Sequence, residues 1–369
     1  MMRVLHLLGA TEDSGGILTV LRNLQTVTAG QGYEHRVLVN RAYRELRKPP
    51  LHYVVSEHLI QDSPSHLALA WGAIRALPEL RAVLRREPFD VLHAHTRGSF
   101  VMTQFLTTLG RRRMVFTNHG FARRRGMYRW GARRRRLITC VLTPNMARHY
   151  GLDLHDPNLR VVSECCGDQF FELPPAARRP AEADGRLRLV GLGNLVEWKK
   201  WHVLLEAMGR LPAAERARLE FHHWGTAPHT PDCQLYERQL QALVVRHQLE
   251  GTCVFHGLSL AVEETLGAAA WFVLPSLNEP CSVALIEALA MGLPAVVTAS
   301  GGNVDIVRNG ETGLFFEPDD VAGLARCLGR IARGEAPMAL AAEIRESVRR
   351  RSATAVARDY TAIYCSLCR

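Results

Sequence analysis

Short apolar runs alternate with amphipathic helical segments along the whole chain. In the first half, the runs that predict strands cover residues 4–8, 35–40, 89–94, 114–117 and 137–143. Between the first two, apolar residues at positions 17, 20, 21, 24 and 27 follow the spacing of one helical face. A further helix is predicted over 67–86, broken or restarted at Pro78. Because short continuous apolar runs are typical of buried parallel strands, the pattern predicts an α/β fold.

The alternation is interrupted once, by a segment rich in proline and alanine at 174–186, which predicts an interdomain linker. After it, strands are predicted over residues 187–192, 219–223, 252–256, 271–275, 295–298 and 313–316. Helices are predicted over residues 200–211, 235–247, 262–269, 282–291, 321–333, 339–350 and 354–367. The chain therefore divides into two Rossmann-like doubly wound domains, 1–173 and 187–351. Such sheets bind ligands beyond the carboxyl ends of their strands, so the cleft between the domains is the expected site.

Composition is that of an ordinary globular protein: 369 residues, 47% of them hydrophobic and 22% charged. The chain contains no run of about 18 apolar residues, so no membrane-spanning helix is expected. Its first apolar run is too short for a signal peptide. The nine cysteines are irregularly spaced, and the terminal pair Cys365 and Cys368 lacks a second pair with which to hold zinc. We therefore expect reduced thiols and a cytoplasmic location.

Positive charge is concentrated in one stretch. Between Val91 and Leu152 the chain has thirteen arginines and no acidic residue, whereas its whole net charge is +10. The densest part, Arg111–Arg136, is interleaved with aromatic residues. This stretch predicts contact with an acidic acceptor molecule or an anionic membrane surface. The alternative is a solvated arginine-rich face.

Two carboxylates flank a predicted helix start in the segment 275–294. Glu279 lies in a loop, and Glu287 lies inside a helix that begins near Ser282. The backbone N–H groups of Cys281, Ser282 and Val283 are expected at the helix N-terminus, which favours a phosphate group. From Ser282 to Glu287 the helix rises ~7.5 Å, so the carboxylates are held apart. The arrangement suits an extended ligand with a sugar, a diphosphate and a ribose; the alternative is a pair of solvated glutamates.

This segment resembles the retaining glycosyltransferases of family 4, which have the GT-B fold. Their pattern of Glu, seven residues and Glu, followed by Gly-x-Pro, is present as Glu279, Glu287 and the residues 292–294. The resemblance continues through 301–307, where Asp305 replaces the usual Glu, and through 309–314. It implies that Glu279 lies near the donor sugar and that Glu287 binds the ribose. Cys281 and Ser282 stand where the family more often has Phe-Gly.

A second segment, 190–200, looks like the family's Gly-Arg-Leu-x-x-x-Lys element. Lys199 falls on the lysine and Asn194 on the arginine, the two residues that bind the donor diphosphate in the family. An amide can hydrogen-bond a phosphate but cannot neutralise it. As a dinucleotide fingerprint the segment is weak, because Val196 takes the place of the third glycine.

Two elements of the first half also match the family. Gly15 and Gly16 precede the first helix, where the family places a loop over the donor diphosphate. His119 follows a strand, where a family histidine lies near the reacting sugar. His93 and His95 lack neighbouring carboxylate or cysteine ligands in sequence, so no metal site is expected there.

The resemblance implies a GT-B architecture with two domains facing across a cleft and a C-terminal helix, about 352–369, crossing back to the N-terminal domain. It implies glycosyl transfer from a nucleotide diphosphate sugar, UDP-sugar first and GDP-sugar next, to a hydroxyl of a glycan, a lipid-linked saccharide or a small molecule, in polysaccharide or glycoconjugate biosynthesis. The expected enzyme retains the anomeric configuration by front-side attack, uses no cofactor or metal, and is cytoplasmic or peripheral on the inner face of the membrane. The alternatives are an arginine-rich nucleic-acid-binding protein and another GT-B enzyme, a phosphorylase or an epimerase.

Overall fold

A computed structural model of the chain describes residues 1–13, 15–63, 65–109, 113–122, 125–174, 185–259 and 261–367. The chain forms two compact units: unit 1 comprises Met1–Cys165 and Ala353–Arg369, and unit 2 comprises Cys166–Ser352. Most of the predicted linker, 175–184, lies outside the described residues.

The first unit therefore ends eight residues before the predicted boundary at 173. The short helix α6 (Gln169–Glu172) belongs to unit 2 because its backbone is held there. The guanidinium of Arg345 donates to the carbonyls of Phe171 and Leu173 at 3.2 and 2.7 Å.

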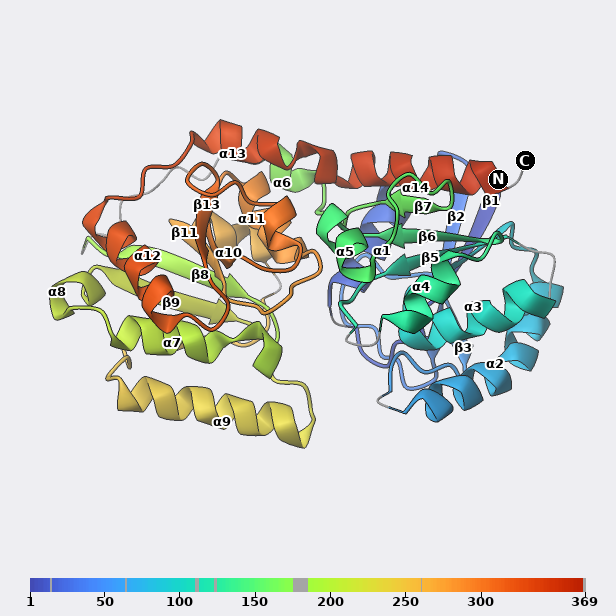
Figure 1. The fold of residues 1–369 in the computed structure, drawn as a ribbon, viewed down its shortest axis with the longest axis horizontal. Helices are drawn as coiled ribbons and strands as arrows, with labels where there is room; N and C mark the ends of the chain where they lie inside the picture. The colour runs from blue at the N-terminus through green and yellow to red at the C-terminus, as the bar shows by residue number, and fades with distance from the viewer. Residues whose placement is uncertain are drawn as a thin grey trace. The chain divides into compact units, whose positions relative to one another are not determined.

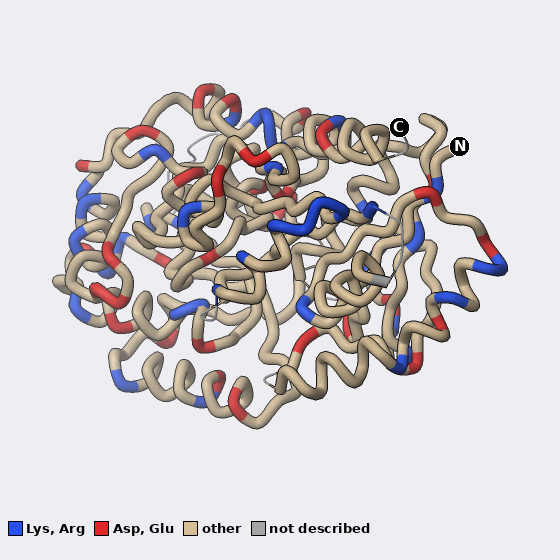
Figure 2. The backbone as a smooth tube through the Cα atoms, turned by 45° about the vertical axis from the view of Figure 1, so that its right-hand side comes forward, with Lys and Arg blue, Asp and Glu red and all other residues tan. Residues whose placement is uncertain are grey.

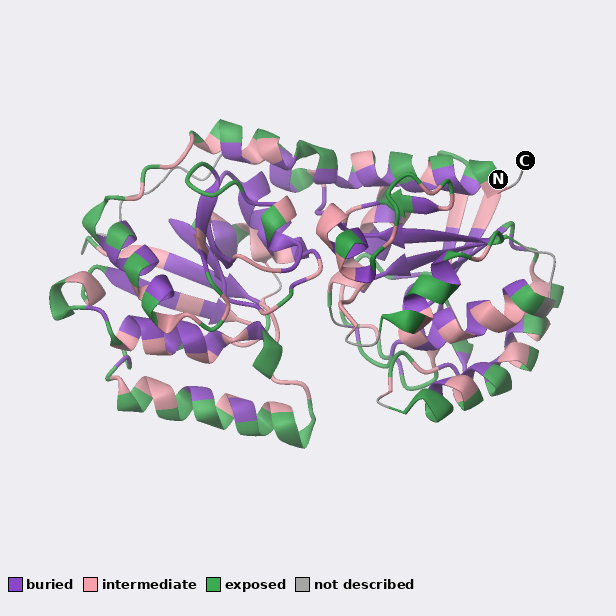
Figure 3. Ribbon diagram, viewed as in Figure 1, coloured by how far each residue is buried: buried purple, intermediate pink, exposed green. Residues whose placement is uncertain are grey.

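In the described part of unit 1, seven strands form one sheet in the order β3-β2-β1-β4-β5-β6-β7, and all neighbours are parallel. The strands are β1 (Met2–Leu7), β2 (Tyr33–Asn40), β3 (Tyr53–Ser56), β4 (Val91–Ala94), β5 (Met114–Asn118), β6 (Leu137–Val141) and β7 (Leu159–Val161). Every residue of β4, β5 and β6 is buried, as their continuous apolar sequences predict (Figure 3).

Helices cover both faces of this sheet, because right-handed crossovers place them on opposite sides of the point where the strand order reverses (Figure 1). The helices are α1 (Gly16–Val27), α2 (His66–Arg86), α3 (Arg97–Leu109), α4 (Gly126–Ala132), α5 (Pro144–Tyr150) and α14 (Ala353–Leu367). Helix α14 packs on α1, and α2 packs on α3. The C-terminal helix is thus part of unit 1.

Helix α2 runs without a break through Pro78, contrary to the sequence expectation. A proline in a helix removes one backbone hydrogen bond, to the carbonyl four residues earlier. That carbonyl belongs to Ile74, which is exposed, so water can satisfy it. Buried Ala73, Ala76 and Leu80 hold the helix to the unit on both sides of the proline.

In the described part of unit 2, six parallel strands follow the order β10-β9-β8-β11-β12-β13. They are β8 (Leu187–Leu192), β9 (Leu219–Trp224), β10 (Cys253–Phe255), β11 (Trp271–Leu274), β12 (Ala295–Thr298) and β13 (Gly313–Phe316). The helical elements are η1 (Glu197–Lys199), α7 (Trp201–Gly209), α8 (Ala213–Arg216), α9 (Pro231–Arg246), α10 (Val262–Gly267), α11 (Val283–Ala290), η2 (Asn303–Asp305), α12 (Val321–Arg333), α13 (Ala341–Ser347) and η3 (Arg349–Arg351).

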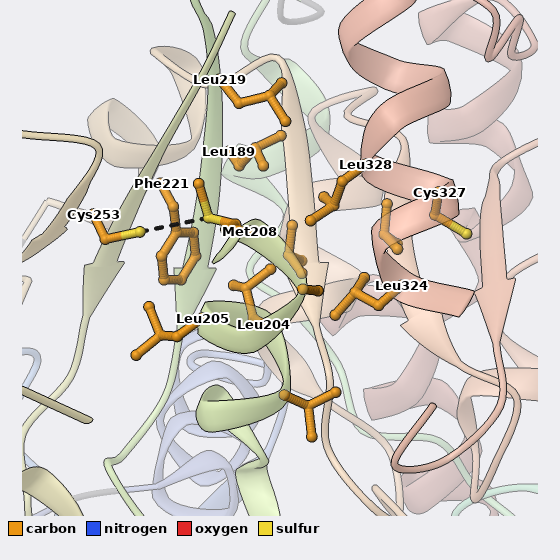
Figure 4. Close-up of a cluster of buried hydrophobic side chains, with 14 of the residues drawn as sticks. Leu189, Leu204, Leu205, Met208, Leu219, Phe221, Cys253, Leu324, Cys327 and Leu328 are labelled. Carbon is orange, nitrogen blue, oxygen red and sulfur yellow. Dashed lines mark hydrogen bonds between the residues drawn. The ribbon is translucent and has the colours of Figure 1, made fainter. Parts of the chain in front are cut away.

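The core of unit 2 lies between the sheet and the helices α7 and α12 (Figure 4). Leu204 and Met208 of α7 meet Leu324 and Leu328 of α12 over Phe221 of β9, and all five side chains are fully or almost fully buried. This buried layer packs on the sheet whose strands β8 and β11 lead into the loops of the predicted site.

The strand order of each sheet reverses at one place, between β1 and β4 in unit 1 and between β8 and β11 in unit 2. Loops that leave neighbouring strands there diverge to opposite faces and leave a crevice for ligands. The sequence-predicted site residues of unit 2 lie in the segments that follow β8 and β11, including η1 and the first turns of α11, on both sides of its reversal.

Candidate functional site

Lys199 and Glu279 form a buried ion pair at the reversal point of unit 2. Lys199 ends η1 after β8, and Glu279 lies in the loop between β11 and α11. The Lys199 Nζ is 2.7 Å from the Glu279 Oε2, and the two side chains are only 11% and 7% exposed. The Nζ also lies 4.6 Å from the ring centroid of Trp198. Glu279 is therefore not the solvated glutamate that the alternative interpretation assumed.

Backbone contacts hold the Glu279 loop in place. Gly301 has φ +60°, and a Cβ built on it would lie 2.4 Å from the Glu279 carbonyl oxygen, so only glycine fits. The next N–H, that of Gly302, donates to the same carbonyl at 2.7 Å. The N–H of Leu277 donates to the carbonyl of Trp198 at 2.8 Å, which ties the two loops together.

The start of α11 has the capped N-terminal geometry that favours an anion. Helix α11 begins at Val283, and the Oγ of Ser282 caps it by accepting from the N–H of Leu285 at 3.2 Å. The N–H groups of Val283 and Ala284 precede the capped one and point along the helix axis, where the dipole favours negative charge. Ser282 and Val283 thus lie where the sequence placed them, with Ser282 as the cap rather than a helical residue.

A buried arginine, which sequence reasoning missed, stands behind this helix start. The Nη1 of Arg351 lies 3.7 Å from the Cys281 Sγ, and its Nη2 donates to the Asp305 carbonyl at 3.1 Å. Burial lowers the pKa of the guanidinium, although Cys281 and Asp305 oppose this. Arginine still stays charged at neutral pH, so it adds positive potential beside α11. Arg351 ends a run of three arginines, and nothing in the sequence distinguishes it.

Glu287 and Asn194 complete the predicted donor set within unit 2. Glu287 is 8% exposed and projects from the middle of α11, about 7.5 Å along the axis from Ser282. Asn194 follows Gly193 in the loop after β8, and its carbonyl accepts from the Trp201 Nε1 at 3.2 Å. Glu279 thus precedes the start of α11 and Glu287 follows it, in the order that the sequence predicted.

In unit 1, Gly15 is the N-cap residue of α1, exposed and with φ +84°. A cluster that the sequence did not reveal lies beside it. The buried carboxylate of Asp13 accepts from the Arg22 guanidinium at 2.8 Å and from the Arg47 backbone N–H at 2.7 Å. Burial raises the pKa of Asp13, but these donors outweigh it and hold the pKa below its usual value. Gly16 opens the helix.

His119 lies after β5, and both of its ring nitrogens are engaged within unit 1. Its Nδ1 is 2.5 Å from the Oε1 of buried Glu164, and its Nε2 is 3.0 Å from the His95 Nδ1. The contacts continue from His95 Nε2 to His6 Nδ1 and from His6 Nε2 to His35 Nδ1, each at 2.9 Å. A hydrogen-bonded chain of four imidazoles thus ends on one carboxylate.

Glu164 sets the direction of this chain, because a carboxylate only accepts hydrogen bonds. His119 therefore carries its proton on Nδ1, and each further histidine donates through Nδ1 in turn. The far end, the Nε2 of His35, is buried and has no hydrogen-bond partner among the residues that the structure describes. As a result the His119 side chain, expected near a sugar, offers no ring nitrogen without first giving up one of these bonds.

Four buried histidines, which we term the histidine cluster, remain neutral at neutral pH: His6, His35, His93 and His95. Burial lowers the pKa of His35 to about 4, and burial together with neighbouring imidazoles lowers the other three well below their usual value. Nitrogens of His6, His93 and His95 lie within 4.8 Å of one another. The nitrogens of His93 meet the Tyr364 and Thr117 hydroxyls at 2.8 Å, so hydrogen bonds satisfy this group without an ion.

The arginine-rich stretch lies partly on α4. Arg111, Arg112, Arg123 and Arg124 are outside the described residues. Trp130 of α4 is 53% exposed, and the Arg134 guanidinium carbon lies 4.0 Å from its ring centroid. Figure 2 marks the basic positions of the backbone in blue and the acidic ones in red. Among the helices that the structure describes, none is long and apolar enough to cross a bilayer.

Comparison with known proteins agrees with this fold. The family model described as "Glycosyl transferases group 1" matches residues 186–333, and the one described as "Glycosyltransferase Family 4" matches residues 14–162. The two matches together cover β2 to β7 of the first sheet, all of the second sheet and both loops of the Lys199–Glu279 pair. The chain belongs to the family 4 type of GT-B glycosyltransferases.

Among curated proteins, the chain is 29% identical over 191 residues to 2-deoxystreptamine N-acetyl-D-glucosaminyltransferase of Niallia circulans, covering 50% of this chain and 47% of that protein. It is 30% identical over 191 residues to the colanic acid biosynthesis glycosyltransferase WcaL of Salmonella typhimurium, covering 49% and 44%. The matched part thus spans a little under half the length of these relatives.

Solved structures match over the full length. A sucrose-phosphate synthase from Thermosynechococcus elongatus superposes with a TM-score of 0.82 at 19% identity, covering 100% of this chain and 99% of that one. The Anabaena protein HepE, in complex with UDP and glucose, superposes with a TM-score of 0.77 at 16% identity, covering 99% and 100%. At these identities the likeness establishes the GT-B fold alone.

Proposed function

We propose that the chain is a retaining glycosyltransferase that moves a sugar from a nucleotide diphosphate sugar to a hydroxyl group of an acceptor. UDP-sugars are the first candidate donors and GDP-sugars the next. The observation that carries the proposal is the buried pair Lys199–Glu279 at the reversal point of unit 2, beside the positive start of α11. The complex of HepE with UDP-glucose and the relatives in colanic acid and lipopolysaccharide synthesis support a sugar-transfer role.

The ion pair suggests how the donor enters the site. The Lys199 ammonium is paired with the Glu279 carboxylate. A diphosphate carries more negative charge than one carboxylate and also gains the N–H groups of α11, so it takes over the ammonium. Glu279 is then released to accept hydrogen bonds from sugar hydroxyls, and Glu287 accepts from the ribose.

The reaction that follows is departure of the nucleoside diphosphate with its electron pair. Lys199 and the α11 start stabilise the charge that develops on the leaving oxygen, with the buried Arg351 behind them. The acceptor hydroxyl attacks the same face, and its proton passes to the departing phosphate oxygen. Glu279 positions the sugar and forms no covalent bond to it. Gly15, Gly16, Asn194 and His119 stay predicted contacts with the donor.

The acceptor is proposed to be a glycan, a lipid-linked saccharide or a small molecule. The expectations of no metal, a cytoplasmic location and contact of Arg111–Arg136 with an acidic acceptor or a membrane surface remain predictions. An arginine-rich nucleic-acid binder would not need the buried carboxylate and ammonium of unit 2.

A donor panel tests the function. The purified chain is incubated with UDP-, GDP- and ADP-sugars and candidate acceptors, and products are identified by mass spectrometry and their anomeric configuration by NMR. We expect one nucleotide series to be turned over with retention, Lys199→Met to be inactive, and Lys200→Met to retain activity as the matched control. Sugar release that requires inorganic phosphate would indicate a phosphorylase, and conversion of the donor sugar itself would indicate an epimerase.

A further inference from the structure

Helix α2 of unit 1 is apolar on two opposite faces. Its inner face buries Leu69, Ala73, Ala76 and Leu80 against the unit. At about 100° per residue, these positions fall within roughly 60° of one another. A helix at the surface of a protein ordinarily presents polar residues opposite such a face.

The outer face of α2 does not follow this rule. Leu67, Trp71 and Ile74 are 84%, 63% and 43% exposed, and Pro78 is exposed as well. By the same helical geometry these four lie within roughly 60° of one another, opposite the buried face. Exposed positions recur along α2 in Figure 3. The first three turns of the helix therefore present one continuous apolar stripe to solvent.

The remaining turns continue this face with positive charge. Arg81 and Arg85 fall in line with the stripe, and Arg75 and Arg86 flank it; all four are exposed. The acidic residue of the helix, Glu79, is turned toward Ser56 and His58 and bonds to both. The outward charge of α2 is therefore entirely positive.

We propose that the outer face of α2 is an interfacial surface that lies flat on an anionic lipid bilayer. Leucine, tryptophan and isoleucine on one face, continued by arginine, is the pattern by which a helix enters the boundary between headgroups and acyl chains. The apolar side chains enter the acyl boundary, the Trp71 ring occupies the headgroup level, and Arg81 and Arg85 reach lipid phosphates. This surface is distinct from Arg111–Arg136, and its argument does not depend on the proposed function.

Charge decides against the other occupants of this face. A second copy of the chain, packed α2 against α2, would bring the same arginines together in a parallel arrangement or set them against the apolar stripe in an antiparallel one, and neither arrangement supplies an anion. A neutral protein partner would cover the stripe but leave Arg81 and Arg85 without anions. An anionic bilayer satisfies both parts of the face at once.

Flotation of the full chain with unilamellar vesicles tests the proposal. We expect the chain to bind vesicles of phosphatidylcholine and phosphatidylglycerol, and to bind less to vesicles without phosphatidylglycerol. The fraction of bound chain should decrease as the salt concentration is raised, because salt screens exposed charges. The double variant Trp71→Ser with Ile74→Ser should weaken partitioning into vesicles by about tenfold or more. Full burial of either apolar side chain alone is enough to change the partition coefficient by more than tenfold, and here the burial is partial. Arg81→Gln with Arg85→Gln should weaken it about thirtyfold at low salt.

Matched controls come from unit 2. Leu235→Ser with Val245→Ser removes two apolar side chains of α9 that are 50% and 64% exposed, and should leave binding unchanged. Arg326→Gln with Arg330→Gln removes two exposed arginines of α12 and should also leave binding unchanged. The proposal is overturned if the wild type does not bind anionic vesicles at low salt, if the α2 variants bind like the wild type, or if sedimentation shows that the α2 stripe instead holds a dimer.

Discussion

Separating the two members of the ion pair should lower stability and activity in different ways. Lys199→Met leaves the Glu279 carboxylate buried without its cation, and Glu279→Gln leaves the ammonium without its anion. Removing one partner of a buried pair costs about 3–5 kcal/mol. For a unit of this size each kcal/mol lowers the melting temperature by about 2–4 °C. Each single variant should therefore melt about 10 °C below the wild type.

The double variant distinguishes pairing from two independent contributions. With both charges removed, no uncompensated charge stays buried, so a coupling energy of about 2–4 kcal/mol should leave the double variant about 4–6 kcal/mol less stable than the wild type, whereas additive losses would amount to about 6–10 kcal/mol. Turnover should be low in all three variants, because the diphosphate needs the ammonium and the sugar needs the carboxylate. Calorimetric melting and donor turnover are measured on the same samples. Single variants that melt like the wild type, or a double variant that is simply additive, would refute the interpretation of a buried pair.

Three further outcomes are expected. The folded pKa values of the histidine cluster lie below the unfolded value of about 6.5, so the free energy of unfolding is highest above that pH and decreases as pH falls. Between pH 7 and 5.5 the four histidines together should lower the free energy of unfolding by about 5 kcal/mol. A melting temperature that stays constant over that range would contradict this expectation. Glu164→Gln should lower the free energy of unfolding by about 1 kcal/mol and allow His119 to populate the Nε2–H tautomer. The tautomer is detected by 15N NMR of the imidazole ring. Unchanged Nδ1–H shifts would contradict the assigned direction of the hydrogen-bonded histidines. Gly301→Ala should displace the Glu279 loop and abolish turnover, because the added Cβ would collide with the Glu279 carbonyl oxygen. Gly310→Ala, whose added Cβ meets open space, should leave turnover unchanged. Similar activity of the two variants would show that the close contact between Gly301 and the Glu279 carbonyl is unimportant.

The sequence pattern predicted those strands that are buried on both faces of the sheet. The runs at 114–117 and 137–143 became β5 and β6, and the helix predicted at 321–333 is α12. Strand β3 was missed because it lies at the sheet edge, where Tyr53 and Val55 are 43% and 50% exposed and the run is not continuous. Pro78 was misjudged because helix packing on both sides of a proline outweighs one lost hydrogen bond.

The site was predictable only where a local motif carries it. Lys199 and Glu279 each lie in a segment with recognisable spacing, but nothing local indicates that they pair with each other. Arg351 and Glu164 were missed for the same reason, since their partners are 70 and 45 residues away in sequence. His6 lies in a strand and has no neighbour in sequence that suggests a hydrogen-bonded chain. Long-range polar contacts of this kind arise from the fold rather than from any periodic pattern.

The central claim is that Lys199 and Glu279 mark the binding site of a nucleotide diphosphate sugar. Isothermal titration of UDP, UDP-glucose and GDP-mannose into the wild type, Lys199→Met and Lys200→Met tests it most directly. The account predicts saturable binding of at least one of these ligands to the wild type and to Lys200→Met, and at least tenfold weaker binding to Lys199→Met. Binding that is unaffected by Lys199→Met, or no binding of any nucleotide or nucleotide sugar to the wild type, would contradict it.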